Sequence, residues 1–318
     1  MALQPLHLNQ HAYQAGKSVE TALHQFVVQV EKALGQHEMA LGVFLDIEGA
    51  FNNTSYDSMC AALAKHGVDY TIIRWIKATL EGRLAAASLG GCSRSVAVKR
   101  GCPQGGVLSP LLWCLVVKGL LTRLNEGDIH AQGYANDICL LVVEKFPHKV
   151  SGLIQRALHT VGVWCDEIGL SVNPDKTGLA AFTRRRKLPG FFETRLFVTI
   201  LRSSTSVKYL GVILDSWLTW KEHVDVRVIK AQNLMWACRR AYGATWDLGA
   251  RVVYWLYVSI ISPSVTLASL VWWPGCQTAS AKKKLSKIQR LACLGITGAM
   301  HTTSTAAVEA LIFLPHWI

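Results

Sequence analysis

Residues Ala131–Val143 set an acidic turn into an apolar stretch, because Tyr134-Ala-Asn-Asp137 is followed directly by Ile-Cys-Leu-Leu-Val-Val. A carboxylate in apolar surroundings is costly unless a cation or another partner compensates its charge. We therefore expect an apolar hairpin with Asp137 at its turn and a metal ion as the compensating partner. The preceding residue, Asn136, is uncharged where a two-metal site would use a second carboxylate.

The composition restricts the class of protein. The chain has 318 residues, of which 51% are hydrophobic and 17% charged, which argues against disorder and allows one large domain or two smaller ones. A net charge of +12 favours nucleic acid or an anionic surface as a partner, with a merely basic protein as the alternative.

Nine cysteines lack any Cys-x-x-Cys or zinc-type spacing, which indicates reduced thiols. Residues 1–7 do not resemble a secretory signal, so we expect an intracellular protein of the cytoplasm or nucleus that is not secreted.

Hydrophobic periodicity predicts an alternation of helices and strands over the first two thirds of the chain. Helical spacing is found at 19–34, 57–67, 69–80 and 150–168, and several of these segments end at a glycine. Strands are expected at 39–45, 179–182, 196–201 and 207–214, and loops at 90–91 and 101–106. From Leu218 onward the pattern is helical to the end. We expect an α+β domain over residues 1–215, followed by an all-helical domain over residues 216–318.

One segment is long enough to cross a bilayer. Val252–Trp273 carries no charged residue, but it contains Pro263 and several serine and threonine hydroxyls. We favour a buried helical pair broken at Pro263 and expect no membrane partner. A membrane-spanning helix is the alternative.

Two aspartates follow or begin apolar strands. Asp46 ends the strand predicted at 39–45, and Asp137 lies at the turn of the later hairpin. If these strands are neighbours, both carboxylates lie at one edge of a sheet. Such a pair with Mg²⁺, a hard cation that prefers oxygen ligands, is suited to phosphoryl transfer. Two aspartates alone also occur in turns and helix caps, so this interpretation needs the surrounding sequence.

The surrounding sequence resembles the reverse transcriptases of non-long-terminal-repeat retrotransposons, the LINE-type and jockey-like elements. Six segments match motifs of that family, in the family's order, and together they cover nearly the whole chain. They are Gln10-His-Ala-Tyr-Gln-Ala-Gly-Lys-Ser-Val-Glu-Thr21, Phe44-Leu-Asp-Ile-Glu-Gly-Ala-Phe51, Arg100-Gly-Cys-Pro-Gln-Gly-Gly-Val-Leu-Ser-Pro110, Tyr134-Ala-Asn-Asp137, Gly169-Leu-Ser-Val-Asn-Pro-Asp-Lys-Thr177 and Tyr209-Leu-Gly-Val212.

The resemblance implies a right-hand polymerase palm with partial fingers, followed by an all-helical thumb-like region. It also implies two-metal nucleotidyl transfer that extends a DNA primer on an RNA template with deoxynucleoside triphosphates, using Mg²⁺ or Mn²⁺. Asp46, the backbone carbonyl of Ile47 and Asp137 would be metal ligands. Asn136 would lie at the remaining ligand position, and Lys176 would protonate or stabilise the departing pyrophosphate. An exposed loop lysine is the alternative for Lys176.

The same resemblance assigns residues to the substrates. Phe51 would lie beneath the incoming sugar and exclude a 2′-hydroxyl by its bulk, with an ordinary core phenylalanine as the alternative. Gln104, Gly105 and Gly106 would let the backbone approach the template and the new base pair. A helix-entry turn before Pro110 is a second interpretation of the same residues, and both can hold.

The helical region carries a cluster of cations that would suit a thumb. Lysines and an arginine alternate with apolar residues along one predicted helix, as contacts to successive phosphates require. The cluster consists of Lys282, Lys283, Lys284, Lys287 and Arg290. A solvated helix face is the alternative.

Three features differ from the family pattern. The chain begins within the fingers, and we expect no endonuclease before the palm and no ribonuclease H domain after it, so the resemblance is to a protein truncated at both ends. Asn136 replaces a metal-binding carboxylate, and its amide nitrogen is a donor that a cation repels. Loss of one such electrostatic group slows catalysis by roughly 10²–10³-fold. Asn52, where the family usually has aspartate, lies outside the metal ligands.

Two hypotheses follow. The first is an RNA-directed DNA polymerase-like protein of a retrotransposon, with activity impaired by Asn136 and by the incomplete fingers. The second is a catalytically inactive nucleic-acid-binding relic or domesticated fragment. The sequence does not predict an oligomeric state.

Overall fold

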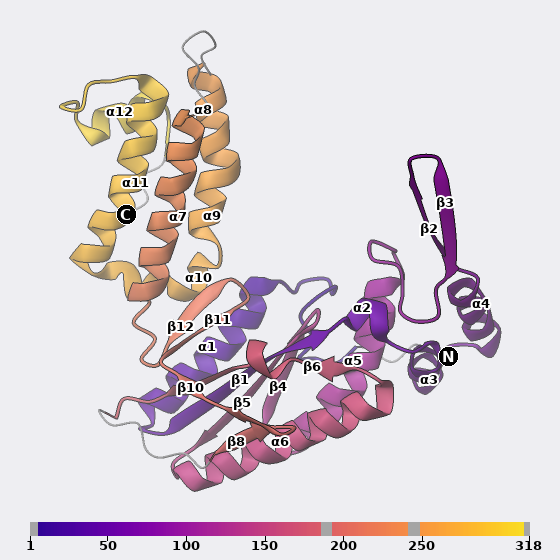
Figure 1. The fold of residues 1–318 in the computed structure, drawn as a ribbon. Coiled ribbons are helices and arrows are strands. Elements are labelled where there is room, and N and C mark those ends of the chain that lie inside the picture. The colour runs from indigo at the N-terminus through magenta and orange to yellow at the C-terminus, as the bar shows by residue number, and fades with distance from the viewer. Residues whose placement is uncertain (1–5, 186–192, 241–248, 315–318) are drawn as a thin grey trace. The chain divides into compact units, whose positions relative to one another are not determined.

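A computed structural model describes residues 6–185, 193–240 and 249–314, and the chain divides into two compact units, Met1–Leu210 and Gly211–Ile318. The sequence had suggested a boundary between residues 215 and 216. Unit 1 mixes strands and helices, whereas unit 2 is almost entirely helical. The predicted α+β class is therefore confirmed over the described residues (Figure 1).

A mixed sheet forms the centre of unit 1. Its strand order is β10-β7-β1-β5-β4, with β6 pairing at the end of β1, and all these pairs are antiparallel except β10 with β7. The strands are β1 (Met39–Glu48), β4 (His130–Tyr134), β5 (Asp137–Glu144), β6 (Ser171–Val172), β7 (Gly178–Phe182) and β10 (Ser203–Ser204). The central strand β1 is buried along nearly its whole length, as the continuous apolar run 39–45 had predicted.

Helices pack against the sheet in two groups, because successive side chains of a strand point to opposite faces. Phe44 packs its ring 5.4 Å from that of Phe26 on helix α1 (Val19–Gly35). The next residues in the alternation, Val43 and Leu45, join a large apolar core with the other helices of unit 1. These are α2 (Ala50–Asn53), α3 (Tyr56–Lys65), α4 (Tyr70–Glu81), α5 (Ser109–Asn125) and α6 (Pro147–Ile168).

The helix ends agree with the chemistry of their sequences. Ser18 begins α1 with a capping box, in which its hydroxyl accepts from Thr21 N–H. Asp69 caps α4 by accepting from Thr71 N–H. Gly169 ends α6 in the left-handed conformation with φ +74°. These three boundaries were expected from the sequence.

Several strands differ from the sequence prediction. The segment 196–201 is a hairpin of β8 (Thr194–Leu196) and β9 (Thr199–Leu201), with Phe197 at φ +54° in its turn. The segment 207–214 is likewise interrupted, between β11 (Ser206–Tyr209) in unit 1 and β12 (Val212–Asp215) in unit 2. Leu210 and Gly211 both have positive φ there. The glycines predicted as a loop at 90–91 join two strands that the sequence analysis missed, β2 (Leu84–Leu89) and β3 (Cys92–Ala97).

Unit 2 contains two long helices and several short ones. The helices are α7 (Lys221–Arg240), α8 (Ala250–Leu256), α9 (Ser262–Thr266), α10 (Ser269–Trp272), α11 (Ala279–Thr297) and α12 (Thr305–Leu311), with a π-helical turn η2 (Tyr257–Ile261) and a 3₁₀ turn η3 (Trp273–Gln277). A further 3₁₀ turn in unit 1, η1, spans Pro174–Lys176.

The predicted break at Pro263 is wrong. Helix α8, the π-turn η2 and α9 run continuously through Pro263, and the chain turns instead at Leu267 and at Ala268, whose φ is +55°. Within the π-turn, Ser262 N–H bonds to the carbonyl of Tyr257, five residues back. This wider hydrogen-bonding pattern directly precedes the proline, which has no N–H to offer.

Within the described residues, no single helix is both long and apolar enough for a membrane span. Ala250–Thr266 and Ser269–Gln277 together meet the length and composition criteria, with a bend of 46° between them. In the structure one side of this segment is buried, including Tyr257, Ile261, Val265 and Trp272.

The close contact at Gly101 generates a first prediction. Gly101 has φ +72°, and a Cβ there would lie 2.5 Å from the backbone oxygen of Phe51. We expect Gly101→Ala to lower the free energy of unfolding by about 2–4 kcal/mol, because backbone strain and overpacking add. Denaturant unfolding measures this change. Gly152→Ala is the matched control, because Gly152 lies in α6 with no atom near its Cβ position. Equal stability of the two variants would contradict the prediction.

A second prediction concerns pH. His223 is buried in unit 2, its Nδ1 accepts from Ile213 N–H at 3.1 Å, and burial together with the Arg227 charge lowers its pKa to about 4. The unfolded chain binds a proton near pH 6.5, so stability is lost as pH falls from about 6.5 towards 4. Thermal unfolding across this range should show a weaker pH dependence in His223→Asn, whose side-chain oxygen can still accept from Ile213. An unchanged slope would show that His223 is not responsible.

Candidate active site

The register of the central strands brings two carboxylates together. In the β1–β5 ladder Asp46 lies directly opposite Asp137, at the end of β1 and the beginning of β5. Cβ atoms of such a pair are about 4.5–5.5 Å apart. The expected proximity of these two residues at one sheet edge is therefore confirmed.

Both side chains lie on the same face of the sheet. Leu45 and Ile47 of β1, and Ile138 of β5, belong to the core beneath α5 and α6. Because side chains alternate along a strand, Asp46 and Asp137 point to the other face. Asp46 follows the apolar run of β1 and Asp137 precedes that of β5, so the pair is partly buried at the ends of these strands rather than in the core.

A two-residue turn holds Asp137 in place. Tyr134 pairs with Asp137 across this turn, and Ala135 adopts φ +53°, which is strained for a residue with a Cβ. The indole N–H of Trp113 on α5 donates to the carbonyl of Ala135 at 2.6 Å. Ile47 N–H donates to the carbonyl of Asn136 at 3.1 Å. These two bonds fix the turn to α5 and to β1.

The side chain of Asn136 contacts the carboxylate of Asp46. Its Nδ2 donates to Asp46 Oδ1 at 2.5 Å, while Lys176 Nζ lies 3.7 Å from Asp46 Oδ2. Burial and the nearby Asp46 charge together raise the pKa of Asp137 to about 6. The site thus carries excess negative charge that one exposed lysine only partly offsets.

A pocket of about 320 Å³ opens beside this pair. Its lining includes Asp46, Ile47, Phe51, Gln104, Asn136 and Lys176, so the structure gathers six of the predicted site residues. Phe51 is half-buried, with its ring 6.1 Å from that of Trp113. Gly105 and Gly106 belong to the same loop as Gln104 but are not among the lining residues. Asp137 is not among them either, but it adjoins the pocket because it follows Asn136 and lies opposite Asp46.

The loop carrying Gln104 is tied to the segment that carries Phe51. Gly101 N–H donates to the carbonyl of Thr54 at 2.8 Å, and Cys102 N–H donates to that of Phe51 at 2.7 Å. The loop then enters α5, where the Ser109 hydroxyl bonds back to the carbonyl of Pro103. Both interpretations of this motif, a helix-entry turn and a loop beside the site, therefore agree with its geometry.

Sequence reasoning missed two residues of the site. Glu48 lines the pocket, and its carboxylate accepts from Ser171 Oγ at 3.3 Å and Asn173 Nδ2 at 3.0 Å. It fixes the segment that leads to Lys176. Glu48 could have been identified because it lies two residues after Asp46 and therefore on the same face of β1. The second missed residue is Trp113, which holds the hairpin turn and which no local sequence signal marks.

The segment before α1 also supports the hairpin. Residues Asn9 and His11 exchange backbone hydrogen bonds with Gly133, one residue before the turn begins. A Cβ at Gly133 would lie 2.7 Å from Gln10 Oε1. A side chain at position 133 would therefore require the buried Gln10 amide to move, and the first matched motif acts here as a support for β4.

The donor set fits a divalent cation incompletely. Two adjacent carboxylates and the pocket-lining Ile47 offer hard oxygen ligands. The pKa of Asp137 is raised first by burial and then by the Asp46 charge, and a cation would compensate that charge. In the described part of the chain, no group of three or more histidine, cysteine, aspartate or glutamate side chains is arranged to hold a metal. Rotation of the Asn136 amide would present its oxygen, which is a neutral ligand in place of a charged one.

The predicted nucleic-acid-binding cations lie on α11 in unit 2, and two of the five are engaged within that unit. Lys284 forms an ion pair with Asp225, and Arg290 donates to the carbonyl of His301 at 2.6 Å. Lys283 and Lys287 are exposed, and Lys282 is half-exposed. The role assigned to this cluster remains a prediction.

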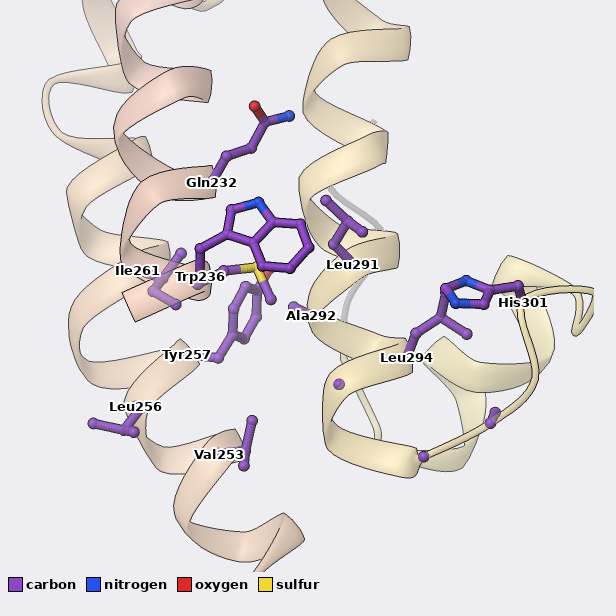
Figure 2. Close-up of a pocket in the computed structure, with 14 residues that line it drawn as sticks. Gln232, Trp236, Val253, Leu256, Tyr257, Ile261, Leu291, Ala292, Leu294 and His301 are labelled. Atoms are coloured by element: carbon purple, nitrogen blue, oxygen red, sulfur yellow. The ribbon is translucent and has the colours of Figure 1, made fainter. Parts of the chain in front are cut away.

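A second concavity, of about 340 Å³, has a different character. Figure 2 shows Trp236 of α7, Tyr257 of η2 and Leu291 of α11 pointing into one space within unit 2. The described lining holds no carboxylate, and His301 is its titratable side chain besides Tyr257. It therefore lacks the groups that a phosphoryl-transfer site requires.

Comparisons with known proteins give a consistent family. The profile described as "Reverse transcriptase (RNA-dependent DNA polymerase)" matches residues 1–214. The RNA-directed DNA polymerase from mobile element jockey of Drosophila funebris is 28% identical over 92% of this chain and 32% of its own length. The putative 115 kDa protein of a type-1 retrotransposable element of Drosophila melanogaster is 26% identical over 95% of this chain and 29% of its own. The chain thus spans about a third of these relatives.

Solved structures with a similar arrangement include apo telomerase from Candida tropicalis, with a TM-score of 0.49 and 10% identity over 96% of this chain and 54% of that one. Telomerase from Candida albicans in complex with a fragment of telomeric RNA gives a TM-score of 0.47 and 12% identity over 98% and 56%.

The amide at position 136 generates a third prediction. Asn136→Asp adds a third carboxylate to Asp46 and Asp137. Repulsion among the three should lower the midpoint of thermal unfolding in EDTA. Mg²⁺ should then raise that midpoint by more in the variant than in the wild type. Thermal unfolding with and without MgCl₂ measures both effects. Asn52→Asp is the charge-matched control, because Asn52 is exposed and does not line the pocket. Equal Mg²⁺ shifts in the two variants would contradict the prediction.

Proposed function

Because the chain belongs to the reverse transcriptase family, we propose that its Asp46–Asp137 site extends a DNA primer on an RNA template, using deoxynucleoside triphosphates. The resemblance to non-long-terminal-repeat retrotransposon proteins, predicted from six motifs, is confirmed by relatives that match more than nine tenths of the chain. The relatives are about three times as long, so activity in this chain itself is our inference.

The observation that carries the proposal is the pairing of Asp46 with Asp137 beside a pocket of about 320 Å³. Two carboxylates held opposite each other on adjacent strands, with a lysine ammonium within 4 Å of one of them, are a suitable arrangement for transfer of a nucleotidyl group. The net charge of +12 further supports a polyanionic partner.

We assign the following roles to residues of the pocket. Asp46, Asp137 and the carbonyl of Ile47 would hold Mg²⁺ or Mn²⁺, which supplies charge neutralisation at the reacting phosphate and activation of the attacking hydroxyl. Lys176, whose ammonium lies 3.7 Å from Asp46, would donate a proton to the departing pyrophosphate. Phe51 lines the same pocket from α2, where its ring would limit the space around the sugar of the incoming nucleotide.

Gln104 reaches the pocket from the loop before α5, and the adjacent Gly105 and Gly106 carry no side chain that would keep a template away. We assign these three residues to the template and the new base pair. The cations on α11 would contact phosphates of the nucleic acid, with Lys282, Lys283 and Lys287 more available than the two engaged residues.

A second candidate function is nucleic-acid binding without catalysis. Asn136 favours it, because an N–H donor directed at Asp46 occupies an oxygen that a metal would need. Loss of one electrostatic group at a reacting centre costs roughly 10²–10³-fold in rate. The first function then survives only as a slow reaction, unless the amide rotates.

Primer extension on an RNA template distinguishes the two functions. We expect the wild-type chain with Mg²⁺ or Mn²⁺ to extend a primer slowly but faster than Asp46→Ala, and Asn136→Asp to be roughly 10²–10³-fold faster than wild type. The control Asn52→Asp adds the same charge outside the pocket and should match wild type.

Extension by neither wild type nor Asn136→Asp would overturn the polymerase proposal for this chain. Salt-dependent binding of nucleic acid by both proteins would then support the second function. A wild-type rate that exceeds Asp46→Ala would eliminate the non-catalytic alternative.

A further inference from the structure

A concavity of about 430 Å³ lies in unit 1 among α3, α5 and α6, and it shares no lining residue with the Asp46 pocket. Three of its lining residues are small, namely Ala61 and Ala62 of α3 and Gly119 of α5. Leu115, Val116 and Trp164 contribute its apolar wall. The volume falls within the range of about 300–1,000 Å³ that small-molecule sites occupy.

Basic side chains converge on this hollow from two helices. Lys65 and His66 come from the end of α3, and Lys118 and Arg123 come from α5. His66 is only 8% exposed, and its Nδ1 lies 3.4 Å from Lys118 Nζ. Since the lysine is the donor in this contact, the imidazole nitrogen accepts and holds the ammonium at the wall of the pocket.

The negative charge of the lining is much smaller. Glu167 of α6 is the carboxylate among the described lining residues, and it pairs with Arg123 at 2.9 Å. Both side chains of this pair are more than two fifths exposed, so the pair contributes little and Arg123 can turn to another anion. Two lysines and an arginine against one glutamate leave a positive hollow.

We propose that this α3–α5–α6 pocket binds a phosphate group. A guanidinium offers paired N–H donors that match two phosphate oxygens, and the ammonium groups add further charge-assisted bonds. The hydroxyls of Ser58 and Thr122 line the same hollow and supply further donors. The phosphate can belong to a free polyphosphate or to a nucleic-acid backbone, because both present the same oxygens.

The test measures two probes with the full chain in EDTA, which prevents metal-dependent binding at the Asp46 site. The probes are sodium tripolyphosphate and a single-stranded oligonucleotide without a terminal phosphate. We expect Lys65→Gln/Lys118→Gln to weaken binding of at least one probe by about tenfold, because two charge-assisted contacts are lost. The matched control is Lys149→Gln/Arg156→Gln, which removes two exposed cations of α6 that do not line the pocket.

A third variant acts in the opposite direction. Glu167→Gln removes the competing carboxylate and should tighten binding of the same probe about threefold or more. Thermal unfolding of every variant checks that the fold is retained. Sensitivity to tripolyphosphate alone assigns the site to free polyphosphates, and sensitivity to the oligonucleotide assigns it to a backbone. If the pocket and control variants bind both probes equally, the proposal is overturned.

Discussion

The repulsion between Asp46 and Asp137 is the constraint around which unit 1 is organised. Two carboxylates directly opposite each other in adjacent strands destabilise a sheet unless other interactions hold the register. Here the register is held by the apolar residues that precede Asp46 and follow Asp137, all of which except Val143 are buried. A shift of one residue would move these apolar side chains to the wrong faces, so the core enforces the carboxylate pair.

Contacts around the Asp46–Asp137 pair make its position, which the core already determines, more rigid. Trp113 and the backbone of Ile47 bind the turn between β4 and β5 from two sides. Gly133 admits the segment before α1 against the same hairpin, and Glu48 holds the segment before Lys176. Asp46 and Asp137 thus lie at strand ends that several independent contacts hold in place, which is the rigidity that a catalytic site requires.

Much of this arrangement could be predicted from sequence, for a physical reason. The run that ends at Asp46 and the apolar hairpin at Asp137 are both local patterns, and burial of such runs makes them neighbours. The role of Trp113 could not be predicted, because its partner Ala135 lies on another element and no periodicity reports such a contact. The turns at Phe197 and Leu210 were missed because residues with a Cβ rarely adopt positive φ, so their sequences resemble uninterrupted strands. Pro263 was misread because a π-turn can precede a proline without ending the helix.

Asn136 changes the balance between stability and chemistry at this site. Burial and the Asp46 charge already raise the pKa of Asp137, and a third carboxylate at position 136 would add further repulsion. The amide instead donates to Asp46 and relieves part of that repulsion, which stabilises the metal-free fold. The same hydrogen bond competes with any cation for the oxygen it occupies. The amide at position 136 therefore favours stability of the metal-free fold, whereas a carboxylate there would favour metal binding.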